Sequence, residues 1–347
     1  MKLTAEGPGA RAVWNRALAH DSDATVSQTP TWMDCLCASG RWRDITRAYL
    51  ADDGRELVLP LAGWRRFASA SPVAASMPFG WGTGGLLCLE GPLSAADVAA
   101  VVTDLSRERP VRTTLRPGAA MEQAWAAGVP EHVKRTRHMS QSIELADGFS
   151  AVSSRFSRSL GRNVRKAERG PLTVEWDEGR RLVPFFDALY RTSVARWAER
   201  QHEPRALAEW RARRRDPPSK FQLVAERLGA ACRIGVAWRS GAPAAAIVVL
   251  TQGEHSTYWR GAMDQALAGG TGANELLHCK AIEDACQAGR RWYHMGDSAP
   301  GSSLAEFKRR FGAEEEHYTG YRLERWPLTA AEELLREAVK RLLRFRD

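Results

Sequence analysis

The stretch that decides the fold is ACRIGVAWRSGAPAAAIVVLTQGEHSTYWRG, residues 231–261. It contains three apolar segments, at 231–238, 244–250 and 256–261, which are separated by the turn sequences RSGAP and QGEH. Short apolar runs bounded by Gly, Pro and Ser are typical of strands, and turns of this length join antiparallel neighbours. We therefore expect a three-stranded antiparallel meander here.

Helices and strands alternate on both sides of this meander, as the apolar periodicity indicates. Downstream, after the Gly-rich loop AGGTGAN, we expect a helix at 275–288, a strand at 292–295, a helix at 304–311, a strand at 318–323 and a final amphipathic helix at 328–345. Upstream, we expect a cationic helix at 149–169 and helices at 181–199 and 206–215. Pro217 and Pro218 are expected to end this helical run.

The first half of the chain has a related pattern. Its expected elements are a helix at 31–39, a hairpin of strands at 45–50 and 56–61, a helix at 95–107, a strand at 111–115 and a strand over SQSIEL at 140–145. Both halves thus contain a hairpin, a Gly-rich loop and a helix. A chain of 347 residues is long enough for two cores. We predict a mixed α+β (α/β) protein with two lobes, 1–147 and 148–347, each with a mixed, largely antiparallel sheet flanked by helices.

Composition limits the class of partner. The formal net charge is +9, and the basic residues are 43 arginines and only 7 lysines. Arginine binds phosphate and carboxylate through a planar fork, so nucleic acid, nucleotides and anionic lipid headgroups are all compatible partners. The six cysteines lack paired C-x-x-C units, so we expect no metal site. No apolar run approaches the roughly 20 residues that span a bilayer, and we expect a cytoplasmic protein.

Motifs in the second half carry a family resemblance. In chain order they are FSRSLGRNVRKAERG, TSVARW, GAPAAAIVVL, TYWRGAMD, GANELLHCKAIEDACQAG, YHMGDS and EFKRRFG. Together they resemble the Fem-type (FemABX-like) aminoacyltransferases, a branch of the GNAT acyltransferase superfamily with two GNAT-like lobes. PTWMDCL, DDGRELVLPL and SMPFGWGTGG resemble the N-terminal lobe of that family. The resemblance covers nearly the whole chain, and its order of motifs is more specific than any one motif.

The resemblance implies that an amino acid is transferred from aminoacyl-tRNA to an amine or hydroxyl of a small-molecule or cell-wall-precursor acceptor. Peptidoglycan cross-bridge synthesis and natural-product (antibiotic) biosynthesis are the implied settings, and no cofactor is required beyond the tRNA co-substrate. Some relatives use acyl-CoA instead. An acyl-CoA-dependent GNAT N-acyltransferase is therefore one alternative, and a non-catalytic RNA-binding protein of the same fold is another.

The candidate catalytic residues lie in two of these motifs. Lys308 of EFKRRFG matches the Phe-Lys pair of the family and would stabilise a developing oxyanion, with Phe307 packing beside it. The alternative is that Lys308 faces solvent on a short helix. Asp297 of MGDS could accept the proton of an attacking amine. Its alternative is a helix N-cap or a turn residue.

Further residues are candidates for substrate binding. Arg196 in TSVARW resembles an arginine of the family that would meet acceptor phosphates, and Trp197, Tyr258, Trp259 and Arg260 are candidates to line the same cleft. The alternative for the aromatic residues is that they belong to the core. Gly272 and Asn274 lie in the Gly-rich loop, whose backbone N–H groups could hold a phosphate at a helix start. The loop departs from the Q/R-x-x-G-x-G/A turn of acyl-CoA enzymes, because Ala268 stands where the first glycine is required.

Five basic residues form a cationic stripe. Arg158, Arg162, Arg165 and Arg169 recur at spacings of four, three and four, with Lys166 beside them. At helical periodicity they share one face. Such a face could bind the backbone of a tRNA, because phosphate contacts give affinity without reading sequence. The alternative is a solvated charged surface.

Overall fold

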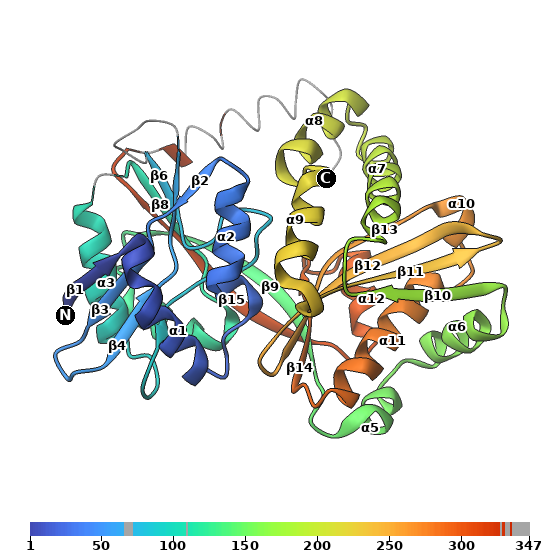
Figure 1. Ribbon diagram of the computed structural model, residues 1–347, viewed down its shortest axis with the longest axis horizontal. Helices are drawn as coiled ribbons and strands as arrows, with labels where there is room; N and C mark the ends of the chain where they lie inside the picture. The colour runs from blue at the N-terminus through green and yellow to red at the C-terminus, as the bar shows by residue number, and fades with distance from the viewer. Residues whose placement is uncertain (66–71, 109, 327, 330–333, 335–347) are drawn as a thin grey trace. The chain divides into compact units, whose positions relative to one another are not determined.

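The structure, a computed structural model, describes residues 1–65, 72–108, 110–326, 328, 329 and 334 (Figure 1). The chain folds into two compact units, residues 1–140 with 315–328 and residues 141–314. It passes from the first unit to the second within strand β9 (Lys134–Glu144) and returns within strand β15 (Glu314–Glu324). The terminal helix expected at 328–345 falls almost wholly outside the described residues.

Among its described residues, the first unit contains short strands and four α-helices. The strands are β1 (Lys2–Glu6), β2 (Trp42–Asp44), β3 (Arg47–Leu50), β4 (Glu56–Leu59), β5 (Ala62–Trp64), β6 (Val73–Ala75), β7 (Leu87–Cys88) and β8 (Arg112–Leu115). The helices are α1 (Arg11–His20), α2 (Pro30–Ala38), α3 (Ala95–Arg107) and α4 (Glu122–Gly128). The predicted hairpin is confirmed as the antiparallel pair β3–β4. The predicted helix at 95–107 is confirmed as α3.

Two sheets organise this unit. One is antiparallel with the order β1-β3-β4-β7. In the other, β2, β5 and β6 pair antiparallel, β6 and β8 pair parallel, and β15 pairs antiparallel with β8. The core contains Val98, Val101 and Leu105 of α3 together with Trp125 of α4, whose ring stacks on Tyr321 of β15 at 5.8 Å. Residues that follow the second unit in sequence therefore complete the core of the first.

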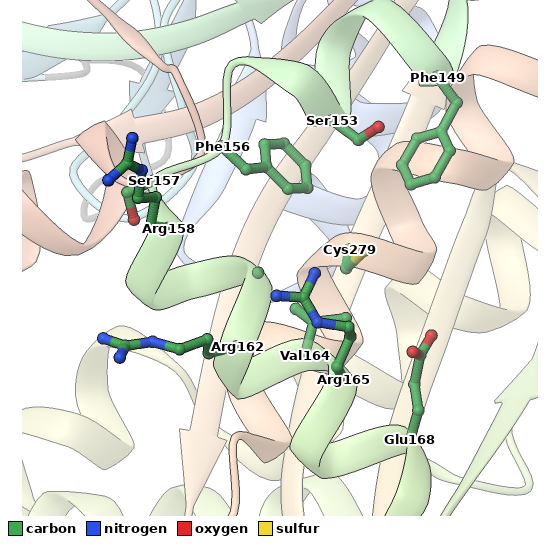
Figure 2. A pocket seen from close by; sticks show the side chains of 11 residues that line it. Phe149, Ser153, Phe156, Ser157, Arg158, Arg162, Val164, Arg165, Glu168 and Cys279 are labelled. Carbon is green, nitrogen blue, oxygen red and sulfur yellow. The ribbon is translucent and has the colours of Figure 1, made fainter.

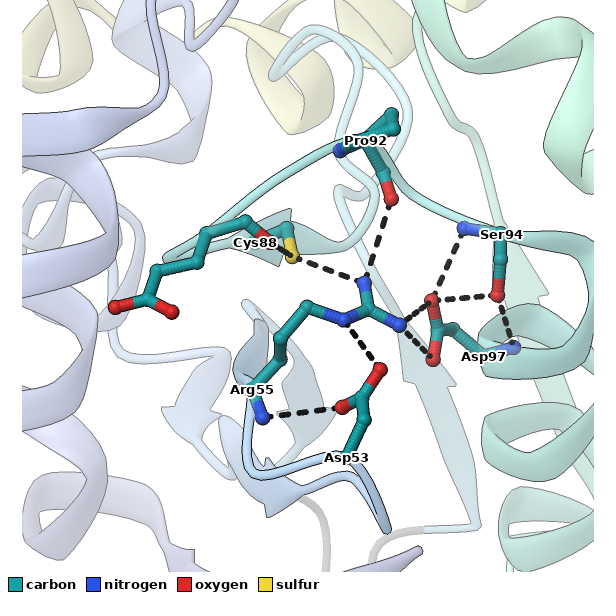
Figure 3. A network of polar contacts seen from close by, with 7 residues as sticks. Asp53, Arg55, Cys88, Pro92, Ser94 and Asp97 are labelled. Carbon is teal, nitrogen blue, oxygen red and sulfur yellow. Dashed lines mark hydrogen bonds and ion pairs between the residues drawn. The ribbon is translucent and has the colours of Figure 1, made fainter.

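A buried ion-pair network fixes the start of α3 (Figure 3). Ser94 caps the helix, since its Oγ accepts the N–H of Asp97, and the Asp97 carboxylate accepts the N–H of Ser94 in return. Arg55, which begins β4's side of the hairpin, donates to both oxygens of the same carboxylate at 3.1 and 3.0 Å. The Arg55 side chain thus connects the N-terminal cap of α3 to the β3–β4 hairpin.

The second unit has a sheet between two layers of helices. Its strands are β10 (Leu172–Asp177), β11 (Cys232–Arg239), β12 (Ala242–Gln252), β13 (His255–Met263) and β14 (Trp292–Asp297). Its helices are α5 (Gly148–Ser154), α6 (Arg158–Arg169), α7 (Val183–Arg200), α8 (Arg205–Arg215), α9 (Pro218–Leu228), α10 (Gln265–Ala268), α11 (Ala273–Gln287) and α12 (Ser303–Arg309). Strands β10 to β13 pair antiparallel in sequence order, which confirms the predicted meander, and β14 joins β13 in parallel.

Alternation along β12 assigns the two faces of this sheet. Ala245, Ile247 and Val249 pack in one cluster with residues of α6 and α11. Helices α7 and α9 cover the opposite face (Figure 1). The predicted mixed α+β class, with mixed sheets flanked by helices, is confirmed. None of the helices among the described residues combines the length and the apolar character needed to cross a bilayer.

Two expectations for the second unit were wrong. The single helix at 149–169 is two helices, because Ser157 caps α6 by accepting the N–H of Leu160 and residues 155–157 break the run. The helical run also continues past Pro217 and Pro218. Pro218 opens α9 at its first position, where the missing N–H costs no hydrogen bond and the fixed φ suits a helix.

Candidate active site

Lys308 lies at the centre of the candidate active site. It belongs to α12, whose first turn is capped by Ser302, and its residue surface is only 1% exposed. Its Nζ donates to the carbonyl oxygens of Gly296 and Asp297, at 2.7 and 2.8 Å. The alternative that Lys308 faces solvent is therefore wrong. The third N–H of the ammonium has no acceptor among the residues that the structure describes.

Burial and charge set the state of this lysine. Burial lowers the pKa of Lys308 to about 8, and the negative charge of Asp297 partly opposes that shift. Asp297 ends β14 with an exposed side chain. It is not the N-cap of α12, because Ser302 holds that position, so the helix-cap alternative is wrong. At neutral pH the Lys308 side chain is therefore an ammonium. It is bonded to the backbone carbonyl of Asp297, whose own side chain is an exposed carboxylate.

A second polar link holds the same loop, and sequence reasoning missed it. Gln141 is fully buried on β9, and its Nε2 donates to the carbonyl of Ala305 in α12 at 3.1 Å. Its Oε1 accepts the hydroxyl of Ser298 at 3.1 Å. Gln141 therefore ties α12 to the residues after β14, the same two segments that Lys308 joins. A single glutamine in a strand carries no motif that would have identified it.

An aromatic cluster surrounds the base of α12. Phe307 packs edge-on against His278 at 5.7 Å and against Phe311 at 5.3 Å. Tyr258 also contacts the His278 ring, with the ring centroids 4.6 Å apart, and the Tyr293 hydroxyl lies 3.1 Å from His278 Nδ1. Burial, together with the charge of Lys308, lowers the pKa of His278 to about 3, so the ring is neutral. Phe307 thus anchors the segment that presents Lys308.

The structure does not bring Tyr258 and Arg260 together. In the β12–β13 pairing, Val249 lies opposite Tyr258 and Val248 opposite Arg260, so Trp259 is an extra, bulged residue. Tyr258 contacts His278 of α11, whereas Trp259 contacts Phe221 of α9. Tyr258 and Arg260 consequently project from opposite faces of the sheet.

Arg260 instead joins a buried ion-pair cluster. Its Nη2 donates to Asp216 Oδ1 at 3.1 Å, and Lys220 Nζ donates to the same oxygen at 2.7 Å. Arg215 and the hydroxyl of Tyr190 donate to Asp216 Oδ2 at 2.8 and 2.9 Å. Burial opposes ionisation of Asp216, but the charges of Arg260 and Lys220 outweigh it and lower the pKa of the carboxyl. One carboxylate thus connects α8, α9 and β13.

Arg196 and Trp197 lie near the end of α7. Arg196 donates to Gln265 Oε1 at 3.3 Å, and its buried Nε has no hydrogen-bond partner among the described residues. Burial and the charge of Arg200 lower the pKa of Arg196. Trp197 is 36% exposed and contacts the Tyr190 ring edge-on. The pair stands on the same face of the sheet as the Asp216 cluster, and apart from Tyr258.

The Gly-rich loop packs tightly against α6. Gly272 begins α11 with a φ of +79°, and a Cβ there would lie 2.7 Å from the carbonyl oxygen of Asn163. Only glycine fits both constraints. Asn274 donates to the sulfur of Met263, and Lys166 donates to the carbonyl of Gly270 at 2.9 Å. Lys166 of the cationic stripe is therefore engaged by the loop.

Three of the remaining members of the stripe line a cavity beside α6. Arg158, Arg162 and Arg165 are exposed on one face of the helix, as their spacing predicts. Together with Phe149 and Phe156 they line a cavity of about 710 Å³ (Figure 2). Arg169, one turn further, does not line it. Within the described part of the chain, no group of three or more His, Cys, Asp or Glu residues is arranged to hold a metal ion.

A protein-family model matches part of the second unit. Residues 154–309 match the family described as an acetyltransferase (GNAT) domain. This range contains the cationic stripe, the meander and Lys308. No curated protein sequence matches the chain. The family resemblance drawn from the motifs therefore has independent support over the second unit.

Solved structures extend the likeness to the whole chain. FemX has a TM-score of 0.65 at 12% identity and covers 93% of this chain and 97% of its own. L-PGS from Bacillus licheniformis has a TM-score of 0.55 at 12% identity, with coverages of 94% and 96%. The C-terminal domain of a putative lysylphosphatidylglycerol synthetase from Agrobacterium fabrum has a TM-score of 0.52 at 12% identity, with the same coverages. At these identities the comparison establishes a shared fold.

Proposed function

We propose that this chain, which has the fold of a Fem-like GNAT acyltransferase, transfers an aminoacyl group from aminoacyl-tRNA to an amine or hydroxyl of a small-molecule or cell-wall-precursor acceptor. The observation that carries the proposal is the buried ammonium of Lys308, held by two carbonyl oxygens beside Asp297. A positive charge that is already fixed and desolvated stabilises a developing oxyanion at no reorganisation cost.

The chemistry needs orientation and charge more than activation. The acceptor nitrogen or oxygen attacks the ester carbonyl carbon of the donor, and the carbonyl oxygen becomes an oxyanion. When the intermediate collapses, the bond to the ribose oxygen breaks and that oxygen takes up a proton. Lys308 would stabilise the negative charge on either oxygen, and Asp297 would accept the proton that the nucleophile loses. Because an aminoacyl ester is already activated, the transfer to an amine is downhill without ATP.

Charge supports an RNA donor. The cationic stripe, Arg158, Arg162, Arg165, Lys166 and Arg169, lies in the same unit as Lys308, and the chain has a net charge of +9. Phosphates of the donor would bind there through sequence-independent contacts. A charged tRNA as donor would place the protein in the cytoplasm.

The acceptor is expected to carry a negative group. Arg196 has a buried Nε without a partner among the described residues, which is a costly arrangement unless an anion is bound nearby. Phosphate or carboxylate groups of a nucleotide-linked or peptide-like acceptor fit this requirement, with Trp197 and Arg260 on the same face of the sheet. Gly272 and Asn274 would line the part of the site that holds the donor, next to Tyr258.

A donor exchange experiment tests the proposal. Purified protein is incubated with a mixture of charged tRNAs and a small-molecule extract, and products are identified by mass spectrometry. We expect an aminoacylated product that disappears when ribonuclease is added first. Turnover with acyl-CoA in the absence of RNA would replace this function with CoA-dependent N-acylation. Salt-sensitive RNA binding without any turnover would identify a non-catalytic RNA-binding protein.

A further inference from the structure

The cavity beside α6 has two walls of different chemistry. Phe149 of α5 and Phe156 form one side, and the arginines of α6 form the other (Figure 2). Val164 and Cys279 contribute further apolar surface. Its volume, about 710 Å³, lies within the range of roughly 300 to 1,000 Å³ that is usual for ligand sites. A ligand that fills it must present both a flat apolar surface and negative charge.

The arginine wall lacks internal neutralisation. Arg158, Arg162 and Arg165 form no hydrogen bond or ion pair with the residues that the structure describes, and Glu168 is the single acidic residue that lines the cavity. Elsewhere in this unit exposed arginines do find carboxylates, as Arg205 does with Glu209 at 2.8 Å. Three like charges held within two helical turns repel one another, so an anion that binds among them removes an unfavourable interaction.

The aromatic wall is recessed. Phe149 and Phe156 are half-buried, and their rings meet edge-to-face at 6.4 Å. Side chains that anchor a protein in a lipid surface protrude from it, whereas these rings lie inside a concavity. A planar ring can enter and stack there. The combination of aromatic rings with an arginine row is how proteins bind unpaired nucleotides, through base stacking and phosphate contacts.

The cavity is also connected to the candidate active site. The Phe156 ring packs against Phe311 at 5.5 Å, and Phe311 contacts Phe307, the neighbour of Lys308. The backbone N–H of Ser157 donates to the carbonyl of Arg310 at 2.8 Å. The wall of the cavity and the segment that presents Lys308 therefore share one packed core within the same unit.

We propose that this cavity binds an unpaired nucleotide of the RNA donor, with the base against Phe149 and Phe156 and the adjoining phosphates on Arg158, Arg162 and Arg165. The inference deepens the proposed function and rests on its RNA donor. It adds a requirement that the charge alone does not impose, because a base enters the cavity only where the RNA is single-stranded.

Binding of short RNAs tests this directly. Fluorescence anisotropy is measured with a labelled single-stranded RNA and with the same strand annealed to its complement. The wild-type protein should bind the single strand about tenfold more tightly. Phe149→Leu should remove most of that preference without changing the salt dependence, since it removes stacking alone. Arg162→Gln should weaken binding severalfold and reduce the salt slope by about one ion.

Matched controls keep these results interpretable. Arg180→Gln removes an exposed arginine that is paired with Glu226 on another surface, and it should leave RNA binding unchanged. Thermal melts identify any variant that fails to fold, and Phe149→Leu is preferred to a change at Phe156, which packs against Phe311.

Four outcomes would overturn the inference: equal affinity for the single strand and the duplex, no effect of either cavity variant, binding of anionic vesicles in place of RNA, or binding of CoA that the same variants abolish. Failure of the proposed function has a different signature. Transfer from charged tRNA that is indifferent to both variants overturns the cavity's role alone. RNA binding that depends on the cavity, with no transfer from any charged tRNA, supports the cavity and contradicts the transfer function.

Discussion

Backbone carbonyls and burial determine the orientation and the pKa of the Lys308 side chain. Two carbonyl dipoles orient its ammonium, and burial brings its pKa down to about 8, close to physiological pH. A lysine of this kind is sensitive both to its own removal and to pH. The two sensitivities separate a role for its charge from a role as a base.

We expect Lys308→Met to lower turnover by about 100-fold or more while the protein stays folded, since one preorganised donor is worth that much to an oxyanion. Below about pH 8 the wild-type side chain is charged, and above it the side chain is neutral. The ratio of wild-type to Lys308→Met turnover should therefore fall as the pH rises through about 8. Rates of both proteins across that range check this. A ratio that rises instead would make Lys308 a proton acceptor.

Asp216 is a second residue whose substitution should have a large effect, in this case on stability. Lys220, Arg215 and Arg260 all converge on its carboxylate, and the Lys220 side chain is 1% exposed. We expect Asp216→Asn to lower the free energy of unfolding by about 3 to 5 kcal/mol, because it leaves buried cations without their counter-charge. Urea titration at pH 7 measures this. Arg205→Ala, which breaks an exposed pair, should cost about 0.5 kcal/mol or less, and an equal loss in both variants would contradict the interpretation.

Acid should reveal the same carboxylate. The pKa of Asp216 is lowered in the folded state, so the stability it contributes is present above its ordinary pKa of 3.8 and is lost as the pH falls below that value. The gap in stability between the wild-type protein and Asp216→Asn should close on acidification.

At this scale the sequence predicted some site residues and missed others. The Phe307–Lys308 pair stands in a recognisable motif. Gln141 and His278 do not, because a buried polar residue is defined by partners that lie 164 and 15 positions away in sequence. The sequence predicts one cleft for Tyr258 and Arg260, but the bulge at Trp259 shifts the alternation of β13 by one residue and places the two side chains on opposite faces.

Helix ends decide where the elements of this protein begin and stop. Ser94, Ser157 and Ser302 each cap a helix by accepting the backbone N–H of the residue three positions ahead. The break between α5 and α6 follows from one of these caps. It aims the arginines of α6 along one wall of the cavity while α5 supplies the other.

We expect Ser94→Ala to lower the free energy of unfolding by about 1 kcal/mol, the usual cost of losing an N-cap. The effect should concern α3, where the Ser94 and Asp97 side chains cap each other's backbone groups. Ser106→Ala is the matched control, because Ser106 only donates to the carbonyl of Val102 near the other end of the helix. Similar costs for both substitutions in thermal melts would contradict the capping role.

The sequence predicted the existence of most elements and misjudged their boundaries. Periodicity located the meander and α3, which are strongly patterned, and also α11, which is long. Pro217 and Pro218 predict the end of a helical run, although proline is equally suited to the first position of a helix. Strand β10 lies outside the predicted elements, although Leu172, Val174 and Trp176 alternate with polar residues in the pattern of a half-buried strand.

The charge of the whole molecule predicts how it should respond to salt. With a net charge of +9 and three arginines at the cavity, binding of single-stranded RNA should weaken as salt rises. At roughly 0.7 ions released per phosphate contact, the cavity arginines contribute a slope of about −2 in a plot of log affinity against log salt. Anisotropy titrations at several salt concentrations give the slope. A slope near zero would exclude phosphate contacts as the source of affinity.

Two lobes were expected from length and from the repeated pattern of hairpin, loop and helix, and two units are present. No sequence pattern predicts that β15 also belongs to the first unit. Tyr321 reaches Trp125, and the N–H and hydroxyl of Thr319 both donate to Glu122, across nearly two hundred positions. Contacts of that sequence separation leave no local pattern in either partner.

That return of the chain has a consequence for synthesis. As the polypeptide emerges from the ribosome, every other strand of the first unit precedes the second unit, yet β15 arrives only after residue 314. The first unit therefore stays incomplete, with the position of β15 unfilled, until the second unit has been synthesised. The second unit can meanwhile complete its own core. The unit that is synthesised first is thus the one that is completed last. A nascent chain that stalls just before β15 would expose an unpaired sheet edge to chaperones.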